Sequence, residues 1–146
     1  MAGLWGCAGG VVELGCQDKV KFLGRQPQQQ VFAELDRSDL FILPSVVAAS
    51  GDMEGIPVAL MEAMAKGVLV LATRHSGIPE LIEHGVTGLL VPERNATAIA
   101  GVLERLVAGE WDLLAMRANA RLKIEHEFNN SHLDLQLVDI CQRLAV

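Results

Sequence analysis

The sequence predicts an α/β fold, in which a Rossmann-like parallel sheet with flanking helices is followed by a helical carboxyl-terminal tail. After Val20, short apolar runs alternate with helical patterns at the spacing of βα units. The short runs lack polar alternation, which is typical of parallel strands buried on both faces. Proline opens and glycine closes several of the helical stretches. Together these observations predict one layered domain.

Two strands and one helix are expected in the first part of this pattern. Residues 20–23 form a short apolar strand closed by glycine. A helix is predicted over residues 27–35, because proline is tolerated in a first helical turn. Residues 40–43 form a continuous apolar run that is too short for a helix, so a buried strand is expected. A loop of small residues, 45–52, follows.

The middle of the chain repeats the alternation. Pro57 opens a predicted helix over residues 57–66, which Gly67 ends. A third strand is expected at residues 68–72, and a short helix at residues 79–83. The fourth strand is expected at residues 89–91.

The last third of the chain has a wholly helical pattern. Asn95 is a suitable N-cap for a helix with an apolar face. A second helix is predicted from Trp111 to about Phe128, and Ser131 caps a third. The apolar residues of the first helix are Ile99, Val102, Leu103 and Leu106, and those of the last are Leu133, Leu137, Ile140 and Leu144.

Composition limits the classes of function. The 146 residues are 51% hydrophobic and 21% charged, which fits one globular domain. Twelve basic against 18 acidic residues give a net charge of −6, which argues against a nucleic-acid partner. No apolar run approaches the roughly 18 residues of a membrane-spanning helix. Three cysteines without metal-ligand spacing favour free thiols in a cytoplasmic, reducing setting.

The stretch E-G-I-P-V-A-L-M-E-A-M-A, which begins at Glu54, carries the most chemical information. With Pro57 as the first helical residue, Glu54 lies in the loop before the helix and Glu62 lies in its second turn. Between the two carboxylates, the free N–H groups of the first turn suit hydroxyls and anionic oxygens. This geometry predicts a binding site at the mouth of the helix.

Glu62 has two interpretations, because its helix is apolar nearly all round and a buried carboxylate needs donors. In one, neighbouring backbone N–H groups satisfy it. In the other, Glu54 and Glu62 accept from the hydroxyls of a sugar or ribose. The loop after the strand at residues 40–43 favours the second, because open α/β sheets bind ligands at the carboxyl ends of their strands.

Several blocks together resemble the carboxyl-terminal half of retaining glycosyltransferases of family 4. Besides the segment from Glu54 to Glu62, they are Gly67, Thr73, S-G-I-P-E at 76–80 and G-V-T-G-L-L-V at 85–91, with K-F-L-G at 21–24 and L-P-S at 43–45 upstream. The resemblance implies a GT-B architecture, in which the second of two Rossmann-like domains holds a UDP- or GDP-linked sugar. It implies glycosyl transfer in surface polysaccharide biosynthesis, with no cofactor and no metal.

The resemblance also assigns roles to individual residues. Glu54, as the catalytic candidate, contacts the hydroxyls of the donor sugar and supports the transition state, and Glu62 accepts from the ribose. The sugar and diphosphate site is lined by Gly55, Ile56, Pro57 and Val58. Ser45 lies close to the cleft, and the nucleobase is framed by Leu23, Gly24 and Arg25.

Two departures from the family pattern limit these expectations. Leu69 stands where the family usually has proline. The Gly-Arg strand and the lysine that neutralise the diphosphate are absent, and residues 1–10 match nothing. Residues 1–18 are therefore expected to be an atypical or remnant segment. Residues 19–146 are expected to be a donor-binding domain truncated on its amino-terminal side.

From this truncation we expect the isolated chain to be inactive or weakly active, since the saccharide or lipid-linked acceptor is bound by a missing amino-terminal domain. An alternative is a non-catalytic fragment or a nucleotide-sugar-binding or interaction module. The apolar face of the last helix predicts self-association. The inner face of the cytoplasmic membrane is the alternative to a free cytoplasmic location.

Two further hypotheses concern weaker signals. His75 follows the third predicted strand and is expected to be a solvated loop residue, with a ligand contact as the alternative. A generic dinucleotide binder is disfavoured, because no G-x-G-x-x-G follows a strand.

Overall fold

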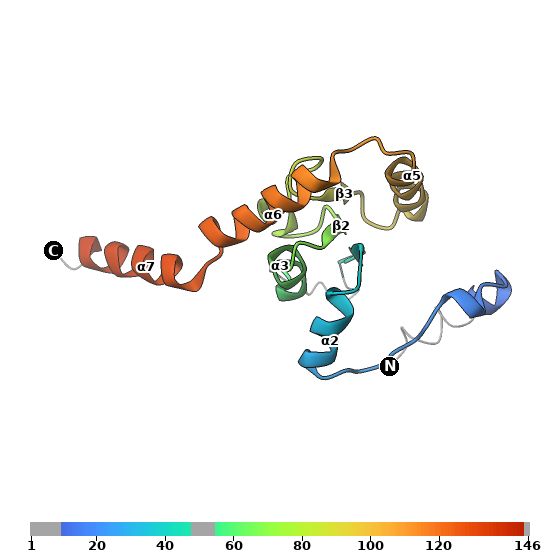
Figure 1. Cartoon of the computed structure of the whole chain (residues 1–146). Coiled ribbons are helices and arrows are strands. Elements are labelled where there is room, and N and C mark those ends of the chain that lie inside the picture. Colours follow the sequence, from blue (N-terminus) through green and yellow to red (C-terminus); the bar gives the residue numbers. More distant parts are fainter. Residues whose placement is uncertain (1–9, 48–54, 145–146) are drawn as a thin grey trace. The chain divides into compact units, whose positions relative to one another are not determined.

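The computed structural model describes residues 10–47 and 55–144 of the chain (Figure 1). The chain divides into two compact units, Met1–Phe32 and Ala33–Val146. In the first unit, residues 10–13 are helical and the short 3-10 helix η1 covers Gln17–Lys19. Helix α2, Gln28–Leu35, begins in the first unit and ends in the second. It confirms the helix expected at this position.

The strand predicted at residues 20–23 is wrong. These residues belong to no strand, and Val20, Phe22 and Leu23 are all exposed. A strand exists only where a neighbouring backbone completes its hydrogen bonds. The apolar pattern was therefore sufficient to suggest an extended segment but could not supply its partner.

In the second unit, the described residues form a three-stranded sheet of β1 (Leu40–Leu43), β2 (Leu69–Thr73) and β3 (Leu89–Val91). The order is β1-β2-β3 and both pairings are parallel, with Leu40 opposite Leu69 and Leu71 opposite Leu89. This confirms the predicted parallel sheet. Burial differs from the expectation at β1, which is only half-buried, whereas all of β2 and β3 is buried.

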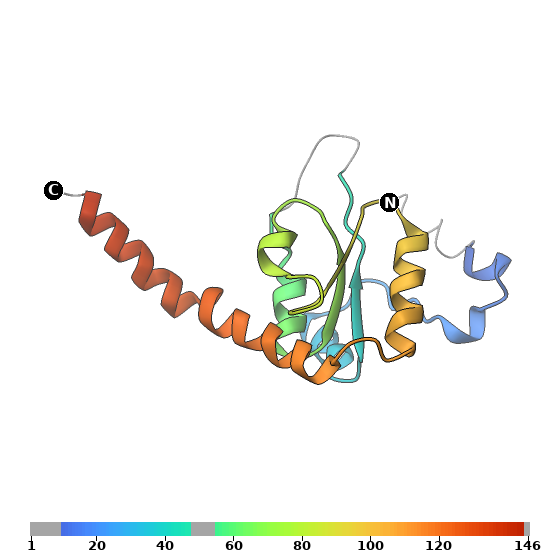
Figure 2. The same ribbon diagram turned by 90° about the horizontal axis from the view of Figure 1, so that it is seen from above.

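Helices cover both faces of this sheet. Figure 2 shows α3 (Val58–Ala65) and α4 (Ile78–Leu81) on one face and α5 (Ala96–Val107) on the other. Helix α6 (Leu113–Glu127) packs against α3 and β2, and α7 (Asn130–Leu144) follows it. The layered arrangement confirms the predicted fold class, including the helical tail.

One hydrophobic core cluster lies between the sheet and helices α5 and α6. Its buried members are Leu69, Leu71, Leu89, Val91, Val102 and Met116. The predicted apolar face of α5 is confirmed, because Ile99, Leu103 and Leu106 also pack against this cluster. Its predicted cap is confirmed as well, since Asn95 Oδ1 accepts from the Ala98 N–H at 2.9 Å.

The last helix has a different environment. Among its side chains that the structure describes, the predicted apolar residues are exposed: Leu133, Leu137, Ile140 and Leu144. In the described parts of the chain, no helix is both long enough and apolar enough to cross a membrane.

The turn between α4 and β3 is held by side chains. The Leu90 N–H donates to His84 Nδ1 at 3.0 Å, and the Glu83 N–H donates to Thr87 Oγ1 at 2.9 Å. The pKa of His84 lies below its ordinary value of 6.5, first because of desolvation and then because of the positive charges of Arg74 and Arg105. The fold therefore favours neutral His84.

A prediction about pH follows from His84. Because its pKa is lower in the folded than in the unfolded state, the unfolded chain binds more protons below pH 6.5. The stabilisation is therefore complete above pH 6.5 and is lost as the pH falls through the folded pKa. We expect urea titrations at pH 7.5 and 5.5 to show a smaller decrease in unfolding free energy for His84→Gln than for the wild type. Equal decreases would contradict the assignment.

Candidate functional site

The three strands end at one edge of the sheet, because they are parallel. The chain that follows each strand therefore emerges at the same side: residues 44–47 after β1, residues 74–77 after β2 and residues 92–95 after β3. Ligands of open α/β sheets bind at this carboxyl edge. The edge is the candidate site.

Ser45 lies at this edge and is held by the neighbouring strand. The hydroxyl of Thr73, the last residue of β2, donates to the Ser45 carbonyl oxygen at 2.5 Å. Thr73 is buried. The backbone after β1 is thus tied to the end of β2.

Gly55 and Ile56 lie against the connection between β2 and α4. A Cβ atom at Gly77 would lie 2.9 Å from Ile56 Cγ1 and 3.8 Å from the Gly55 carbonyl carbon. Only glycine at position 77 permits this approach without a shift of the Ile56 side chain. The structure thus brings Gly55, Ile56 and the SGIPE block together.

Pro57 and Val58 form the start of α3, one residue later than predicted. Pro57 has ψ of 126°, so it is the N-cap rather than the first helical residue. The Pro57 side chain makes no capping hydrogen bond, and Val58 is exposed. The Leu60 N–H donates to the Pro57 carbonyl oxygen at 3.0 Å, whereas the N–H groups of Val58 and Ala59 have no acceptor within the helix and suit other acceptors. The predicted end at Gly67 is confirmed, since its φ of +74° suits glycine after a helix.

The other predicted site residues fall in different places. Glu62 is half-buried on α3. Glu54 lies outside the described residues. The residues predicted to frame a nucleobase belong to the first compact unit: Leu23, Gly24 and Arg25. In that unit Leu23 is exposed and its carbonyl oxygen accepts from the Gln26 side chain.

His75 is buried, so its expected place as a solvated loop residue is wrong. Its Nδ1 lies 2.8 Å from Glu93 Oε1, and only 2% of the residue is exposed. The other carboxylate oxygen of Glu93 accepts from the Val47 N–H at 3.1 Å. Arg94 Nη2 donates to the Val47 carbonyl oxygen at 3.0 Å. The residues after all three strands are therefore linked.

The electrostatics of Glu93 agree with this geometry. Its pKa is lowered from 4.5, mainly by the hydrogen bond with His75 and next by the Val47 N–H. The carboxylate is therefore ionised at neutral pH, and the imidazole nitrogen that faces it is the donor.

A hollow of about 300 Å³ lies at the same edge, between β1, β2 and the start of α5. Its walls are partly polar, because Thr73, Arg94 and Asn95 take part. The remaining lining residues are Pro44, Val46, Ala96 and Ile99. Within the described ranges, no cluster of three or more His, Cys, Asp or Glu could hold a metal ion.

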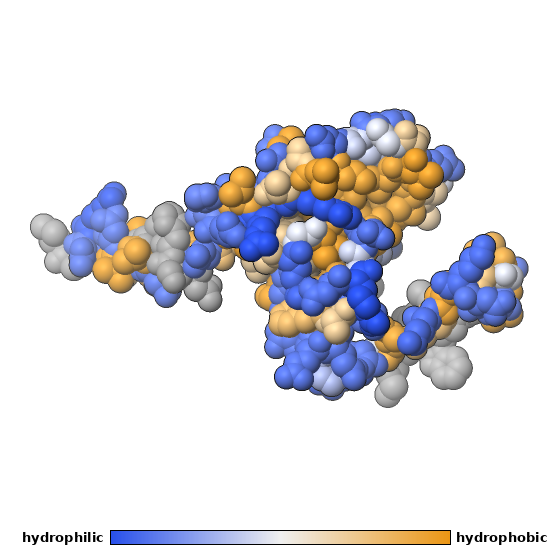
Figure 3. All heavy atoms as spheres, viewed as in Figure 1, coloured by the Kyte–Doolittle hydropathy of each residue, from blue (hydrophilic) through white to orange (hydrophobic). Residues whose placement is uncertain are grey.

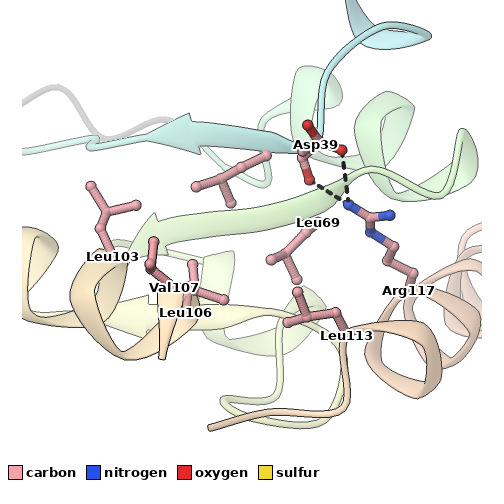
Figure 4. Close-up of a pocket in the computed structure, with 8 residues that line it drawn as sticks. Asp39, Leu69, Leu103, Leu106, Val107, Leu113 and Arg117 are labelled. Carbon is pink, nitrogen blue, oxygen red and sulfur yellow. Dashed lines mark hydrogen bonds and ion pairs between the residues drawn. The ribbon is translucent and has the colours of Figure 1, made fainter. Parts of the chain in front are cut away.

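A second hollow of about 240 Å³ lies at the opposite end of the strands (Figure 4). Leucines of β1, β2, α5 and α6 line it, and Figure 3 shows apolar side chains gathered beside α5. Arg117 closes one side, where its Nη2 donates to the Asp39 carbonyl oxygen at 2.8 Å. Apart from Asp39 and Arg117 its lining is apolar, so this hollow offers fewer donors and acceptors than the carboxyl edge.

Comparison with known proteins decides the family. The family described as "Glycosyl transferases group 1" matches residues 11–123. The chain belongs to the glycosyl transferases group 1. This family match covers the described site residues after β1 and around α3.

Two curated relatives of this group 1 chain have names that assign them to polysaccharide synthesis. The amylovoran biosynthesis glycosyltransferase AmsK of Erwinia amylovora is 54% identical over 129 residues, which are 88% of this chain and 32% of AmsK. The WcaL glycosyltransferase assigned to colanic acid biosynthesis in Escherichia coli (strain K12) is 49% identical, with the same shares. The chain thus spans about a third of the length of these relatives.

A solved structure agrees with the fold. The group 1 chain matches Anabaena Alr3699/HepE, solved in complex with UDP, with a TM-score of 0.78 and 23% identity. The match covers 95% of this chain and 36% of HepE. It places the three-stranded sheet and its helices within the GT-B fold, as predicted.

Proposed function

We propose that this chain supplies the donor-binding half of a retaining family 4 glycosyltransferase. The reaction moves a glycosyl group, such as a hexosyl group, from a nucleotide-sugar to a saccharide or lipid-linked acceptor in surface polysaccharide biosynthesis. The observation that carries the proposal is the convergence of Ser45, Gly55, Ile56 and the uncapped start of α3 at the carboxyl edge of the sheet. The 54% identity to the amylovoran enzyme supports the biosynthetic class.

The uncapped start of α3 suits the diphosphate of the donor. Its N–H groups point out of the helix and carry its positive dipole end, so they stabilise anionic oxygens without a metal ion. Gly55, Ile56, Pro57 and Val58 then line the sugar and diphosphate. No cofactor is required, because the nucleotide-sugar, UDP- or GDP-linked, is itself the substrate. The UDP bound in the HepE structure supports this donor class.

The carboxylates have separate roles in the proposal. Glu54 contacts the sugar hydroxyls and stabilises developing charge in the transition state. Glu62 accepts from the ribose hydroxyls. Ser45 forms part of the cleft wall, and the nucleobase is framed by Leu23, Gly24 and Arg25.

The acceptor is assigned to an amino-terminal domain, so we expect the isolated chain to bind donor with little turnover. Its place is the cytoplasm or the inner face of the cytoplasmic membrane, where nucleotide-sugars are used. The exposed apolar residues of α7 also offer a surface for self-association.

The test is a calorimetric titration of the purified chain with UDP-glucose and GDP-mannose. We expect one of the two to bind, and Glu62→Ala to weaken that binding at least tenfold. The reason is that a hydrogen bond to a charged acceptor contributes about 1.5–3 kcal/mol, and about 1.4 kcal/mol corresponds to tenfold in affinity.

Glu104→Ala is the matched control, because Glu104 is an exposed carboxylate on α5. Its variant should bind like the wild type. Absence of binding at millimolar donor would favour the non-catalytic alternative. Turnover by the chain alone would contradict the assignment of the acceptor to another domain.

A further inference from the structure

His75 is unusual in its position. It directly follows β2 in a connection whose neighbouring residues, Arg74 and Ser76, are exposed, yet its own side chain is buried. Among the residues that the structure describes, it is the buried histidine. Burying an imidazole is costly unless a partner satisfies it. The partner is Glu93, 2.8 Å away.

Glu93 transmits this contact to the chain after β1. One carboxylate oxygen of Glu93 lies beside His75, and the other accepts from the Val47 N–H at 3.1 Å. Arg94, the next residue, donates to the carbonyl oxygen of the same Val47 at 3.0 Å. Both polar groups of one backbone residue are thus held by residues far away in sequence.

The backbone conformation at the pair supports a specific role. In the described residues, Ser76 (φ +46°) and Arg94 (φ +54°) are the non-glycine residues with positive φ. They directly follow His75 and Glu93. This conformation is unfavourable for residues with a Cβ atom and concentrates at functional sites. The two connections therefore adopt costly turns at the positions that bring the imidazole and the carboxylate together.

We infer that His75 and Glu93 are positioning residues, which fix the backbone of Ser45 and Val47 so that the carboxyl edge is preorganised for the nucleotide-sugar. This inference rests on the proposed function. Thr73 holds Ser45, and Glu93 with Arg94 holds Val47, so the segment after β1 is fastened at two points. Neither His75 nor Glu93 is assigned a contact with the donor itself.

The physical gain is preorganisation. A segment that is already ordered loses less conformational entropy on binding, and the saving appears as affinity. A purely structural pair would instead change the stability of the fold and leave the affinity of the folded chain unaltered. Affinity and local order are therefore the readouts that separate the two roles.

The experiment uses the full chain labelled with ¹⁵N. In Glu93→Ala, we expect the backbone order parameter of Val47 to fall from about 0.85 to below about 0.6. Calorimetry with UDP-glucose and GDP-mannose should show affinity for the bound donor about three- to tenfold weaker, the usual effect of losing a hydrogen bond. Glu93→Gln should stay within about twofold of the wild type, since its carbonyl oxygen can accept from Val47 and its amide can donate to His75 Nδ1 once the ring proton moves to Nε2.

Arg94→Ala keeps the test decisive if Glu93→Ala does not fold, because Arg94 is exposed and its removal releases Val47 from the other side. Its affinity should also fall, about threefold. Glu104→Ala is the control and should change neither readout. Wild-type affinity in folded Glu93→Ala, or in Arg94→Ala, would overturn the inference while the proposed function stands. If the wild type binds neither donor, the proposed function fails and the positioning role falls with it.

Discussion

Gly88→Ala should destabilise the protein by about 1–3 kcal/mol, the usual cost of overpacking a filled core. A Cβ atom at this position would lie 2.6 Å from Val70 Cγ2, 3.0 Å from Ile82 Cγ2 and 3.1 Å from the Val70 carbonyl oxygen. Val70 lies in the central strand, where it pairs with Phe41 of β1, and both Val70 and Ile82 are buried. The added methyl group therefore has no direction in which its neighbours can yield without loss of packing.

The measurement is urea denaturation of both proteins, supported by thermal melting. For a chain of this size, each 1 kcal/mol corresponds to about 2–4 °C in Tm. Gly101→Ala is the matched control, because Gly101 lies within α5 and nothing would lie within 4 Å of its added Cβ. It should stabilise by about 0.5–1 kcal/mol through helix propensity. A stable Gly88→Ala protein would contradict the packing described at β2.

The sequence was informative where the signals are local. The α5 helix was predictable because Asn95 supplies its cap and its apolar residues recur at helical spacing. The strand β3 was found at its observed position, Leu89–Val91, because a glycine and a proline delimit it. The predicted start of α3 was one residue too early, since the φ of proline suits both an N-cap and a first helical position.

Contacts between segments that lie far apart in the chain could not be predicted from the sequence. Residues 20–23 have the composition of a strand, but pairing depends on a neighbour that composition does not identify. His75 had the pattern of a solvated loop residue, and its burial depends on Glu93, which follows a different strand. That meeting is set by the parallel register of β2 and β3, in which Thr73 lies opposite Val91. Of the candidate site, the block around α3 was therefore predictable, and the links among the three connections were not.

A histidine and a glutamate two residues past the ends of neighbouring parallel strands could have been a signal for this pair. His75 is two residues after Thr73, and Glu93 is two residues after Val91. Equal offsets from paired strand ends place two residues at the same level of the sheet edge. The signal was usable only once the ends of both strands and their pairing were known.

Leu71→Ala should have the largest effect on stability of any variant discussed, about 2–5 kcal/mol. Leu71 is fully buried in the middle of β2, opposite Ile42 of β1 and Leu89 of β3. Truncation removes apolar surface from the main core and leaves a cavity that the paired backbone on both sides cannot close. The loss therefore includes both a transfer and a cavity contribution.

Leu114→Ala is the matched control, because it makes the same substitution at a leucine on α6 that is 79% exposed. It should change the unfolding free energy by less than about 0.5 kcal/mol. Urea denaturation of the two variants and the wild type, under the same conditions, measures the difference. If Leu71→Ala lost as little unfolding free energy as Leu114→Ala, Leu71 would lie outside the core. A three-stranded sheet with a fully buried central strand could not then be the folded state of this chain. A loss confined to Leu71→Ala would instead show that the stability of the sheet depends on the buried strand that ends at Thr73.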